Sequence, residues 1–346
     1  MSMVESKELQ YPTPMYAVFG LIDDLSQFPG KSATEVVQDL KQKGVNAVFG
    51  GYENPALRNE LRKAGIKVYA EIGIFAGSNY WKTHPESRPI TSLGKPMEKE
   101  DWYGGVCPNQ DWLRKQKLEE IKKLCTQSQV DGIWLDFIRY PCHWEVKEPK
   151  LIQTCFCPRC LDLFQKQTHI TIPATLTSTK AKADWILTQH KQEWTAWKCS
   201  VITDYVQACN QLIKKQNPQI VVGLFGVPWN KSEYHNAISE IIAQDYVTLS
   251  KYVDIFSPMV YHKLCYRNVP WIRTAAENIH QLTQKPVVPI VQACSIPDKI
   301  DNTEFIKAVQ TGLESPSSGV ILFTLDYALK ENKYILLDEL FDKELK

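Results

Sequence analysis

The feature that most constrains the fold of this chain is a regular succession of eight short apolar segments rich in Val, Ile, Phe and Tyr. They are MYAVFGL (15–21), NAVFGG (46–51), KVYAEIGIF (67–75), GIWLDFIRY (132–140), IVVGLFGV (220–227), DIFSPMVYH (254–262), VVPIVQA (287–293) and GVILFTLDY (319–327). Amphipathic, helix-like segments separate them. Nearly continuous apolar strands that alternate with helices indicate a parallel sheet covered on both faces. Eight such units predict a single closed (β/α)8 TIM barrel.

The spacing of these segments indicates where the barrel carries insertions. Most strands begin about 20 to 35 residues apart, but the gaps after the third and fourth strands are far longer. We therefore predict an N-terminal extension over 1–14 and a barrel over 15–346, with loop insertions at about 76–108 and 141–180. A long helix is expected at roughly 181–215. Both insertions would emerge at the C-terminal face of the barrel, where barrel enzymes place their catalytic groups.

Charge and hydropathy exclude some classes of partner. The 346 residues include 40 Lys or Arg and 39 Asp or Glu, a net charge of +1, so no nucleic-acid partner is expected. No apolar run approaches the roughly 18 residues of a spanning helix, so no membrane partner is expected either. The opening MSMVESKELQYPTP lacks the apolar centre of a signal peptide, which predicts a cytoplasmic location. A chain whose signal peptide had been removed would look the same.

Charged residues stand at unusual places at the strand ends. Asp136 and Arg139 close the fourth apolar segment, where a structural ion pair would be a poor stabiliser compared with apolar packing. Glu71 lies in the third segment, Glu145 follows the fourth and Asp326 lies in the eighth. Hydrolysis of a glycosidic bond needs one carboxyl group to protonate the leaving oxygen and another to attack or to activate water. These four carboxyl groups are therefore the catalytic candidates, and the arginine would keep one of them ionised.

Other polar and aromatic side chains are candidates for binding the substrate. Their positions are the ends of the sixth and seventh strands and the loops after the third, fourth and fifth. They are Tyr261, His262 and Gln292 at the strand ends, and Trp81, Trp102, Trp144 and Trp229 in the loops. Arg139, at the end of the fourth segment, is a further candidate for binding the substrate. A tryptophan is commonly a core residue. Several in the loops of one barrel face instead predict platforms for sugar rings.

The fourth strand also carries a family resemblance. V-D-G-I-W-L-D-F-I-R-Y-P resembles the D-G-I-x-x-D-x-x-R-Y-P signature of a family of TIM-barrel glycosyl hydrolases. G-I-W-L-D is similar to the nucleophile motif G-x-W-x-D-M-N-E of retaining α-glycosidases, with F-I-R in place of M-N-E. The resemblance implies that Asp136 is the nucleophile. It does not assign the acid, because the fifth and sixth strands end without a carboxylate, so Glu71, Glu145 and Asp326 remain candidates.

Four of the ten cysteines have a spacing that core packing does not require. Cys155, Cys157 and Cys160 form a C-x-C-x2-C pattern, and a tetrahedral zinc site needs a fourth ligand, either Cys107 or Cys142. The segments G-V-C-P-N and C-F-C-P-R-C-L-D-L-F are similar in order and spacing to the zinc cluster of family-42 β-galactosidases. That resemblance implies a structural zinc ion with Cys107 as the fourth ligand. Unligated or disulfide-bonded cysteines are the alternative.

Taken together, these features predict a glycoside hydrolase that acts on an oligosaccharide or polysaccharide. The first alternative is a carbohydrate-binding barrel without hydrolysis, which the missing carboxylates of the fifth and sixth strands favour. The second is a metal-dependent carbohydrate deacetylase. It would require His and Asp ligands, and the seven histidines show no H-x-H or H-E-x-x-H spacing.

Overall fold

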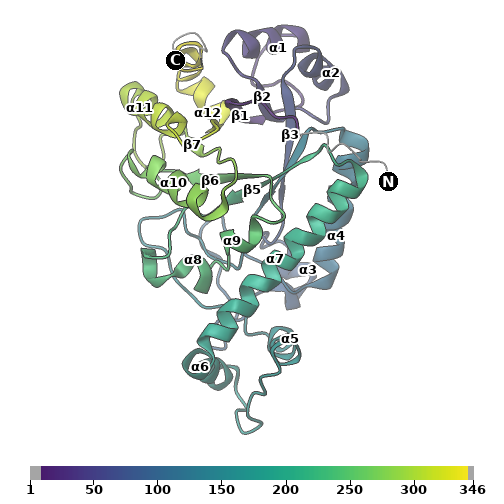
Figure 1. Ribbon diagram of the computed structural model, residues 1–346, viewed down its shortest axis with the longest axis vertical. Helices are drawn as coiled ribbons and strands as arrows, with labels where there is room; N and C mark the ends of the chain where they lie inside the picture. Colours follow the sequence, from purple (N-terminus) through teal and green to yellow (C-terminus); the bar gives the residue numbers. More distant parts are fainter. Residues whose placement is uncertain (1–8, 342–346) are drawn as a thin grey trace, which may run out of the picture.

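The centre of the protein is a closed barrel of eight parallel strands in sequential order (Figure 1). The computed structural model describes residues 9–341. The strands are β1 (Met15–Leu21), β2 (Ala47–Gly50), β3 (Lys67–Gly73), β4 (Gly132–Asp136), β5 (Val221–Gly226), β6 (Ile255–Val260), β7 (Ile290–Gln292) and β8 (Gly319–Phe323). Each strand pairs in parallel with the next, and β1 closes the ring by pairing with β8. The predicted (β/α)8 barrel is confirmed.

Helices surround the barrel, and short helices also occur within its loops. The longer ones are α1 (Ala33–Gln42), α2 (Pro55–Lys63), α4 (Asp111–Lys123), α5 (Pro158–Thr168), α6 (Thr179–Gln189), α7 (Lys191–Gln216), α10 (Trp271–Thr283), α11 (Asn302–Leu313) and α12 (Leu325–Lys330). The short ones are α3 (Tyr80–Thr83), η1 (Pro85–Ser87), η2 (Leu124–Ser128), η3 (Glu233–His235), α8 (Ala237–Glu240), α9 (Tyr246–Leu249), η4 (Tyr334–Leu336) and α13 (Leu337–Leu340). No helix among residues 9–341 has both the length and the apolar character needed to cross a bilayer.

Aromatic rings fill the barrel interior below its mouth. The rings of the five strands β1 to β5 lie with neighbouring centroids 4.7–5.8 Å apart, and they belong to Phe19, Phe49, Tyr69, Trp134 and Phe225. Interlocking rings of this kind leave no pore. The next side chains toward the C-terminal ends of the strands therefore lie directly above an apolar layer.

The largest of these rings depends on a glycine in the neighbouring strand. A Cβ atom on Gly223 would lie 2.1 Å from the ring of Trp134, so β5 can carry no side chain at that point. The indole Nε1 of Trp134 donates a 2.9 Å hydrogen bond to the hydroxyl of Ser257 on β6. This bond satisfies the one polar atom of the buried ring.

The loop after β4 differs from expectation in its helical part. A single helix was expected at 181–215, but α6 and α7 are separate helices that meet at His190, whose φ of −135° and ψ of 32° are not helical. Figure 1 shows α5 and α6 beyond the end of α7, away from the barrel. Helix α7 thus covers the barrel with its C-terminal part and carries the insertion at its N-terminal end.

Two strands end earlier than their apolar segments. Strand β8 stops at Phe323 because Thr324 caps α12, its hydroxyl accepting a hydrogen bond from the backbone N–H of Tyr327. The eighth segment had been expected to continue as strand, so Asp326 lies instead in the first turn of a helix. Strand β4 ends at Asp136, and Arg139 therefore belongs to the loop that follows.

Of the expected N-terminal extension, residues 1–8 lie outside the described residues, while Leu9 and Tyr11 pack against the core.

Candidate active site

The C-terminal ends of the strands open onto a pocket of about 820 Å³. Four carboxyl side chains line it, those of Glu71, Asp101, Asp136 and Glu145. Seven aromatic side chains line it as well, those of Phe19, Trp102, Phe137, Tyr261, Tyr266, Phe323 and Tyr327. A mostly apolar concave site with a few converging polar groups is the usual form of a small-molecule site.

Strand geometry brings Glu71 and Asp136 to this pocket. Alternate residues of a strand face the same side, so Glu71 lies one layer above Tyr69, and Asp136 one layer above Trp134. Strands β3 and β4 pair with Gly73 opposite Asp136. Because Gly73 has no side chain, space remains beside Glu71: a Cβ atom on Gly73 would lie 3.7 Å from Oε1 of Glu71 and 3.3 Å from the ring of Phe137.

Asp136 has two neighbours that favour its ionised form. The backbone N–H of Phe137 donates a 2.6 Å hydrogen bond to Oδ1 of Asp136. Nη1 of Arg139 lies 3.9 Å from the same oxygen. Burial raises the pKa of Asp136, and the positive charge of Arg139 and the backbone hydrogen bond oppose that rise. Asp136 is thus the carboxyl group of the pocket with a direct cationic partner.

The guanidinium of Arg139 is enclosed by aromatic rings. Its side chain is 1% exposed and lies 4.8 Å from the ring centroid of Phe137 and 5.7 Å from that of Tyr103. Phe137 has φ = 49°, in the left-handed region, which is unusual for a bulky residue and directs its ring over the arginine. The guanidinium nitrogens make no hydrogen bond to any described residue. The arginine therefore acts on the nearby carboxylates through its charge.

Two other partly buried carboxyl groups, those of Glu71 and Glu145, hold their protons more tightly than usual. Burial, and next to it the charge of Asp136, raise the pKa of Glu71 to about 8. Burial raises the pKa of Glu145 to about 7, while Arg139 opposes this rise. Different environments thus separate the proton affinities of groups in one pocket, which is the arrangement that acid–base pairs require.

The predicted tryptophans have different surroundings. Trp102 is 54% exposed and lines the pocket. Trp144 is 1% exposed and stacks on Tyr261, with ring centroids 6.3 Å apart, and Trp229 is buried against Trp144. Trp81 donates a hydrogen bond to the carbonyl of Gly105 and does not line the pocket. Among the four, the structure therefore places one at the pocket surface.

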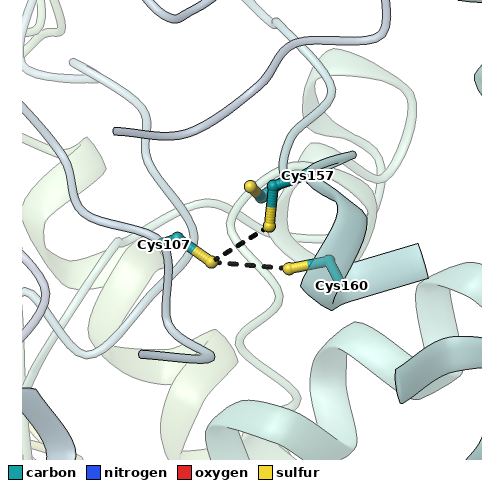
Figure 2. Close-up of side chains that lie close together, drawn as sticks. Cys107, Cys157 and Cys160 are labelled. Carbon is teal, nitrogen blue, oxygen red and sulfur yellow. Dashed lines mark hydrogen bonds between the residues drawn. The ribbon is translucent and has the colours of Figure 1, made fainter. Parts of the chain in front are cut away.

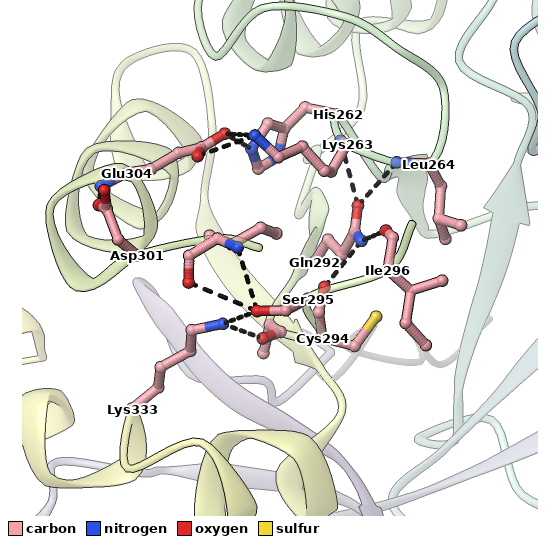
Figure 3. A network of polar contacts seen from close by, with 12 residues as sticks. His262, Lys263, Leu264, Gln292, Cys294, Ser295, Ile296, Asp301, Glu304 and Lys333 are labelled. Atoms are coloured by element: carbon pink, nitrogen blue, oxygen red, sulfur yellow. Dashed lines mark hydrogen bonds and ion pairs between the residues drawn. The ribbon is translucent and has the colours of Figure 1, made fainter. Parts of the chain in front are cut away.

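Three further predicted residues lie outside the pocket lining. Asp326 pairs with Lys330 on α12 at 2.6 Å. His262 is buried, and its Nε2 lies 3.1 Å from Oε1 of Glu304 on α11 (Figure 3). Gln292 is buried too. These side chains bind other parts of the protein because the strand ends that carry them turn into helices or tight loops.

Gln292 connects two loops that form a wall of the pocket. Its side-chain oxygen accepts hydrogen bonds from the backbone N–H groups of Lys263 and Leu264, both 3.1 Å long. Its side-chain nitrogen donates to the carbonyls of Cys294 and Ile296 (Figure 3). Leu264, Cys294 and Ile296 line the pocket. Gln292 thus holds the loops after β6 and β7 together.

Several residues of the pocket were not expected from the sequence. His143 and Lys147 lie in the loop after β4, and Tyr266 lies in the loop after β6. None of them belongs to a motif or a periodic segment. The position of each after a barrel strand is the signal that could have found it.

The four cysteines Cys107, Cys155, Cys157 and Cys160 form a buried cluster. Their sulfur atoms all lie within 4.8 Å of one another. Figure 2 shows the contacts from Cys107, whose sulfur lies 3.4 Å from that of Cys160 and 4.0 Å from that of Cys157. Cys142 is not part of the cluster; its sulfur contacts the carbonyl of Lys150. The fourth member is therefore Cys107, which ties the loop after β3 to the loop after β4.

The geometry of this cluster fits a four-coordinate metal ion. With metal–sulfur bonds of about 2.3 Å, the sulfurs of a tetrahedral zinc site lie roughly 3.8 Å apart, between the two distances given above. The backbone N–H of Ile90 donates to the sulfur of Cys155 at 3.4 Å, and the amide of Asn109 donates to that of Cys160 at 3.2 Å. Such donors stabilise thiolate charge.

Comparisons with known proteins agree with the barrel fold. The glycoside hydrolase domain of PgaB (BpsB) from Bordetella bronchiseptica is 12% identical, with a TM-score of 0.69 over 95% of this chain and 99% of that one. A catalytic mutant of Gan42B, a GH42 β-galactosidase from G. stearothermophilus, is 11% identical, with a TM-score of 0.66 over 96% of this chain and 57% of that one.

The α-L-fucosidase isoenzyme 2 of Paenibacillus thiaminolyticus is 12% identical, with a TM-score of 0.59 over 94% of this chain and 48% of that one. These similarities show the fold alone. No curated protein matches the sequence. The family model described as "Putative glycosyl hydrolase domain" (DUF4015) matches residues 32–294, well over half of the chain. The protein therefore belongs to this glycosyl hydrolase family.

Proposed function

We propose that the protein hydrolyses glycosidic bonds of a carbohydrate substrate with Asp136 and Glu71 as the catalytic pair. The observation that carries the proposal is the difference between two carboxyl groups in one pocket. Asp136 has Arg139 at 3.9 Å and a backbone hydrogen bond, whereas the pKa of Glu71 is raised to about 8. Glu71 is therefore assigned as the protonated acid at neutral pH. Burial also raises the pKa of Asp136, but Arg139 and the backbone hydrogen bond oppose that rise, so Asp136 is assigned as the carboxylate of the pair.

Each protonation state matches one task in the reaction. Glu71 would donate its proton to the glycosidic oxygen as the bond to the anomeric carbon breaks. The carboxylate of Asp136 would stabilise the positive charge that develops on the sugar, either by attacking the anomeric carbon or by deprotonating a water molecule. The leaving sugar takes the proton of Glu71. A water molecule then supplies OH to the anomeric carbon, and its remaining proton restores Glu71.

Glu145 is the second candidate for the acid. Its pKa is raised to about 7, so it too holds a proton over part of the neutral range. The charge with the largest effect on the pKa of Glu145 is that of Arg139, which lowers it, and Asp136 raises it by less. The charge with the largest effect on the pKa of Glu71 is that of Asp136, which raises it. This contrast favours Glu71.

Activated substrates separate these roles. A 2,4-dinitrophenyl glycoside has a leaving group that needs no proton, whereas an alkyl glycoside does. The panel contains dinitrophenyl and alkyl glycosides of mono- and trisaccharides, each in both anomeric configurations. Glu71→Gln should keep activity on a dinitrophenyl substrate and lose it on the matching alkyl substrate. Asp136→Asn should lose both. If Glu145→Gln shows the first pattern and Glu71→Gln does not, Glu145 is the acid. Absence of hydrolysis by the wild type would favour a binding-only barrel.

We further propose that the cysteine cluster holds a structural zinc ion. Its four sulfurs are buried, and a closed four-thiolate site leaves no coordination position for substrate. When bound, zinc would cross-link two segments of the chain and would not take part in the reaction. Cys107 precedes α4, and Cys155, Cys157 and Cys160 stand at the start of α5, so the ion would fix the loop that carries Glu145.

A further inference from the structure

We propose that Trp102 and Tyr266 are two sugar-stacking platforms on opposite sides of the catalytic carboxyl groups, so that the protein cleaves within a sugar chain rather than at its end. This inference rests on the hydrolase proposed above and names its substrate class. It is drawn from the exposure of the two rings, their attachment to the barrel and the size of the pocket between them.

The first observation is the exposure of these two rings. Among residues 9–341, the large apolar side chains that are strongly exposed include two aromatic ones, Trp102 at 54% and Tyr266 at 52%. Both line the pocket that contains Glu71 and Asp136. Exposed aromatic rings gathered at one concave site indicate a ligand surface. The apolar faces of such rings match the C–H faces of sugars, whose hydroxyl groups remain free to hydrogen-bond.

Neighbouring aromatic side chains hold the ring of Trp102 in place through edge-to-face contacts. Its indole makes edge-to-face contacts with Phe137, at a centroid distance of 6.1 Å, and with His143, at 5.5 Å. Tyr103 packs against it in the same way at 5.7 Å. These contacts orient the ring while about half of its surface remains exposed, so little ordering is needed when a sugar stacks on it.

Tyr266 stands on a tight turn after β6. Its backbone N–H donates to the carbonyl of Lys263 at 3.1 Å, and its φ is 52°, in the left-handed region. The ammonium group of Lys147 lies 5.7 Å from its ring centroid. The turn and this contact hold the ring at the rim. Tyr266 therefore has the two properties of a platform, exposure and a fixed position.

The barrel places the two platforms apart. Trp102 follows β3 and Tyr266 follows β6, three positions apart in a ring of eight strands. Asp136, at the end of β4, lies between them in the strand order. The pocket of about 820 Å³ is near the upper end of the roughly 300–1,000 Å³ of small-molecule sites, more space than one sugar ring fills. A chain that stacks on both rings would thus present an internal bond to the carboxyl groups.

The test compares substrates of different length. The probes are reducing-end-labelled hexasaccharides of glucose, galactose and N-acetylglucosamine in α- and β-linkage, with the matching p-nitrophenyl monoglycosides. For a hydrolysed hexasaccharide, Trp102→Ala and Tyr266→Ala should each lower kcat/KM about tenfold, corresponding to about 1.4 kcal/mol. The early products of the wild type should be oligosaccharides of two or more sugars rather than single sugars.

Matched variants separate stacking from general damage. Trp102→Phe and Tyr266→Phe retain a ring and should recover most of kcat/KM. Ile335→Ala removes an apolar side chain that is 59% exposed and lies outside the pocket, and it should behave as the wild type. Calorimetry of the Asp136→Asn variant with the same hexasaccharides measures binding without turnover.

Each result decides between the two proposals. If a hexasaccharide is hydrolysed but both alanine variants keep wild-type kcat/KM, or single sugars appear first, the two-platform inference is wrong and the hydrolase stands. If no hexasaccharide is hydrolysed but one binds and both alanine variants abolish binding, the two rings are platforms of a binding-only barrel, and both the hydrolase and cleavage within the chain are refuted. If nothing binds and nothing is hydrolysed, both proposals are overturned.

Discussion

Nη1 of Arg139 lies 3.9 Å from Oδ1 of Asp136 at the mouth of the barrel, where the arginine side chain is buried and that of Asp136 is 16% exposed. No guanidinium nitrogen of Arg139 hydrogen-bonds to a described residue. A pair held for stability would have its donors satisfied, because unsatisfied buried donors cost free energy. The spacing instead suits an electrostatic role, in which the arginine keeps a neighbouring carboxylate ionised while that carboxylate faces the pocket.

The Asp136→Asn variant separates the catalytic role from the structural one. If Asp136 is the nucleophile or base, turnover should fall by roughly a factor of a thousand or more, because the amide cannot replace the carboxylate. A purely structural pair predicts that the uncompensated Arg139 costs about 3–5 kcal/mol of stability instead. Melting temperature and hydrolysis measured on the same preparation distinguish the two. Lost stability with unchanged activity per folded molecule would refute the catalytic assignment.

Glu71 makes both activity and stability depend on pH. Its pKa is raised in the folded protein to about 8, so the folded state binds this proton more tightly than the unfolded chain. Its contribution to stability is therefore present below pH 4.5 and is lost as the pH rises from about 4.5 toward 8. Activity that needs the protonated acid should decline above pH 8. Glu71→Gln should consequently raise the melting temperature more at pH 9 than at pH 5.

The control for this experiment is Glu148→Gln, which changes an exposed glutamate of the loop after β4. Its melting temperature should follow that of the wild type from pH 5 to pH 9. An equal response of Glu71→Gln and Glu148→Gln at every pH would contradict the raised proton affinity of Glu71.

The cysteine cluster predicts one zinc ion per chain. Elemental analysis of the purified protein should give about one equivalent, and the Cys157→Ser/Cys160→Ser variant should lose it together with part of its thermal stability. Cys142→Ser is the matched control, because its sulfur is buried nearby but outside the cluster, and it should keep the metal. Metal-free wild type with an unchanged melting temperature would contradict the zinc site.

Trp144 and Trp102 should respond in opposite ways to alanine substitution. Trp144 is 1% exposed and packs on Tyr261, so Trp144→Ala should cost about 3–5 kcal/mol of stability through the cavity it leaves. Trp102→Ala should change stability by less than about 0.5 kcal/mol, as surface substitutions commonly do, and should weaken oligosaccharide binding instead. Chemical denaturation and calorimetry measure the two effects. Unchanged stability in Trp144→Ala would return that residue to the set of sugar platforms.

The periodic apolar segments determined the barrel, because eight buried parallel strands with helical connections have few alternative arrangements. The positions of residues inside a strand could also be predicted: Glu71 and Asp136 both line the pocket. The spacing of Cys155, Cys157 and Cys160 likewise predicted a cluster, since three thiols within six residues are already near one another.

Tertiary structure decided which of the other candidates meet. Asp326 and His262 pair with Lys330 and Glu304, because the backbone after β6 and β8 turns them away from the pocket lining. Tyr266, which belongs to no motif, reaches the pocket through a turn with positive φ. Strand periodicity specifies a side chain's direction only while the backbone remains extended. Beyond the strand ends, direction depends on loop conformation and on contacts between residues far apart in the sequence, and these exist only in the folded chain.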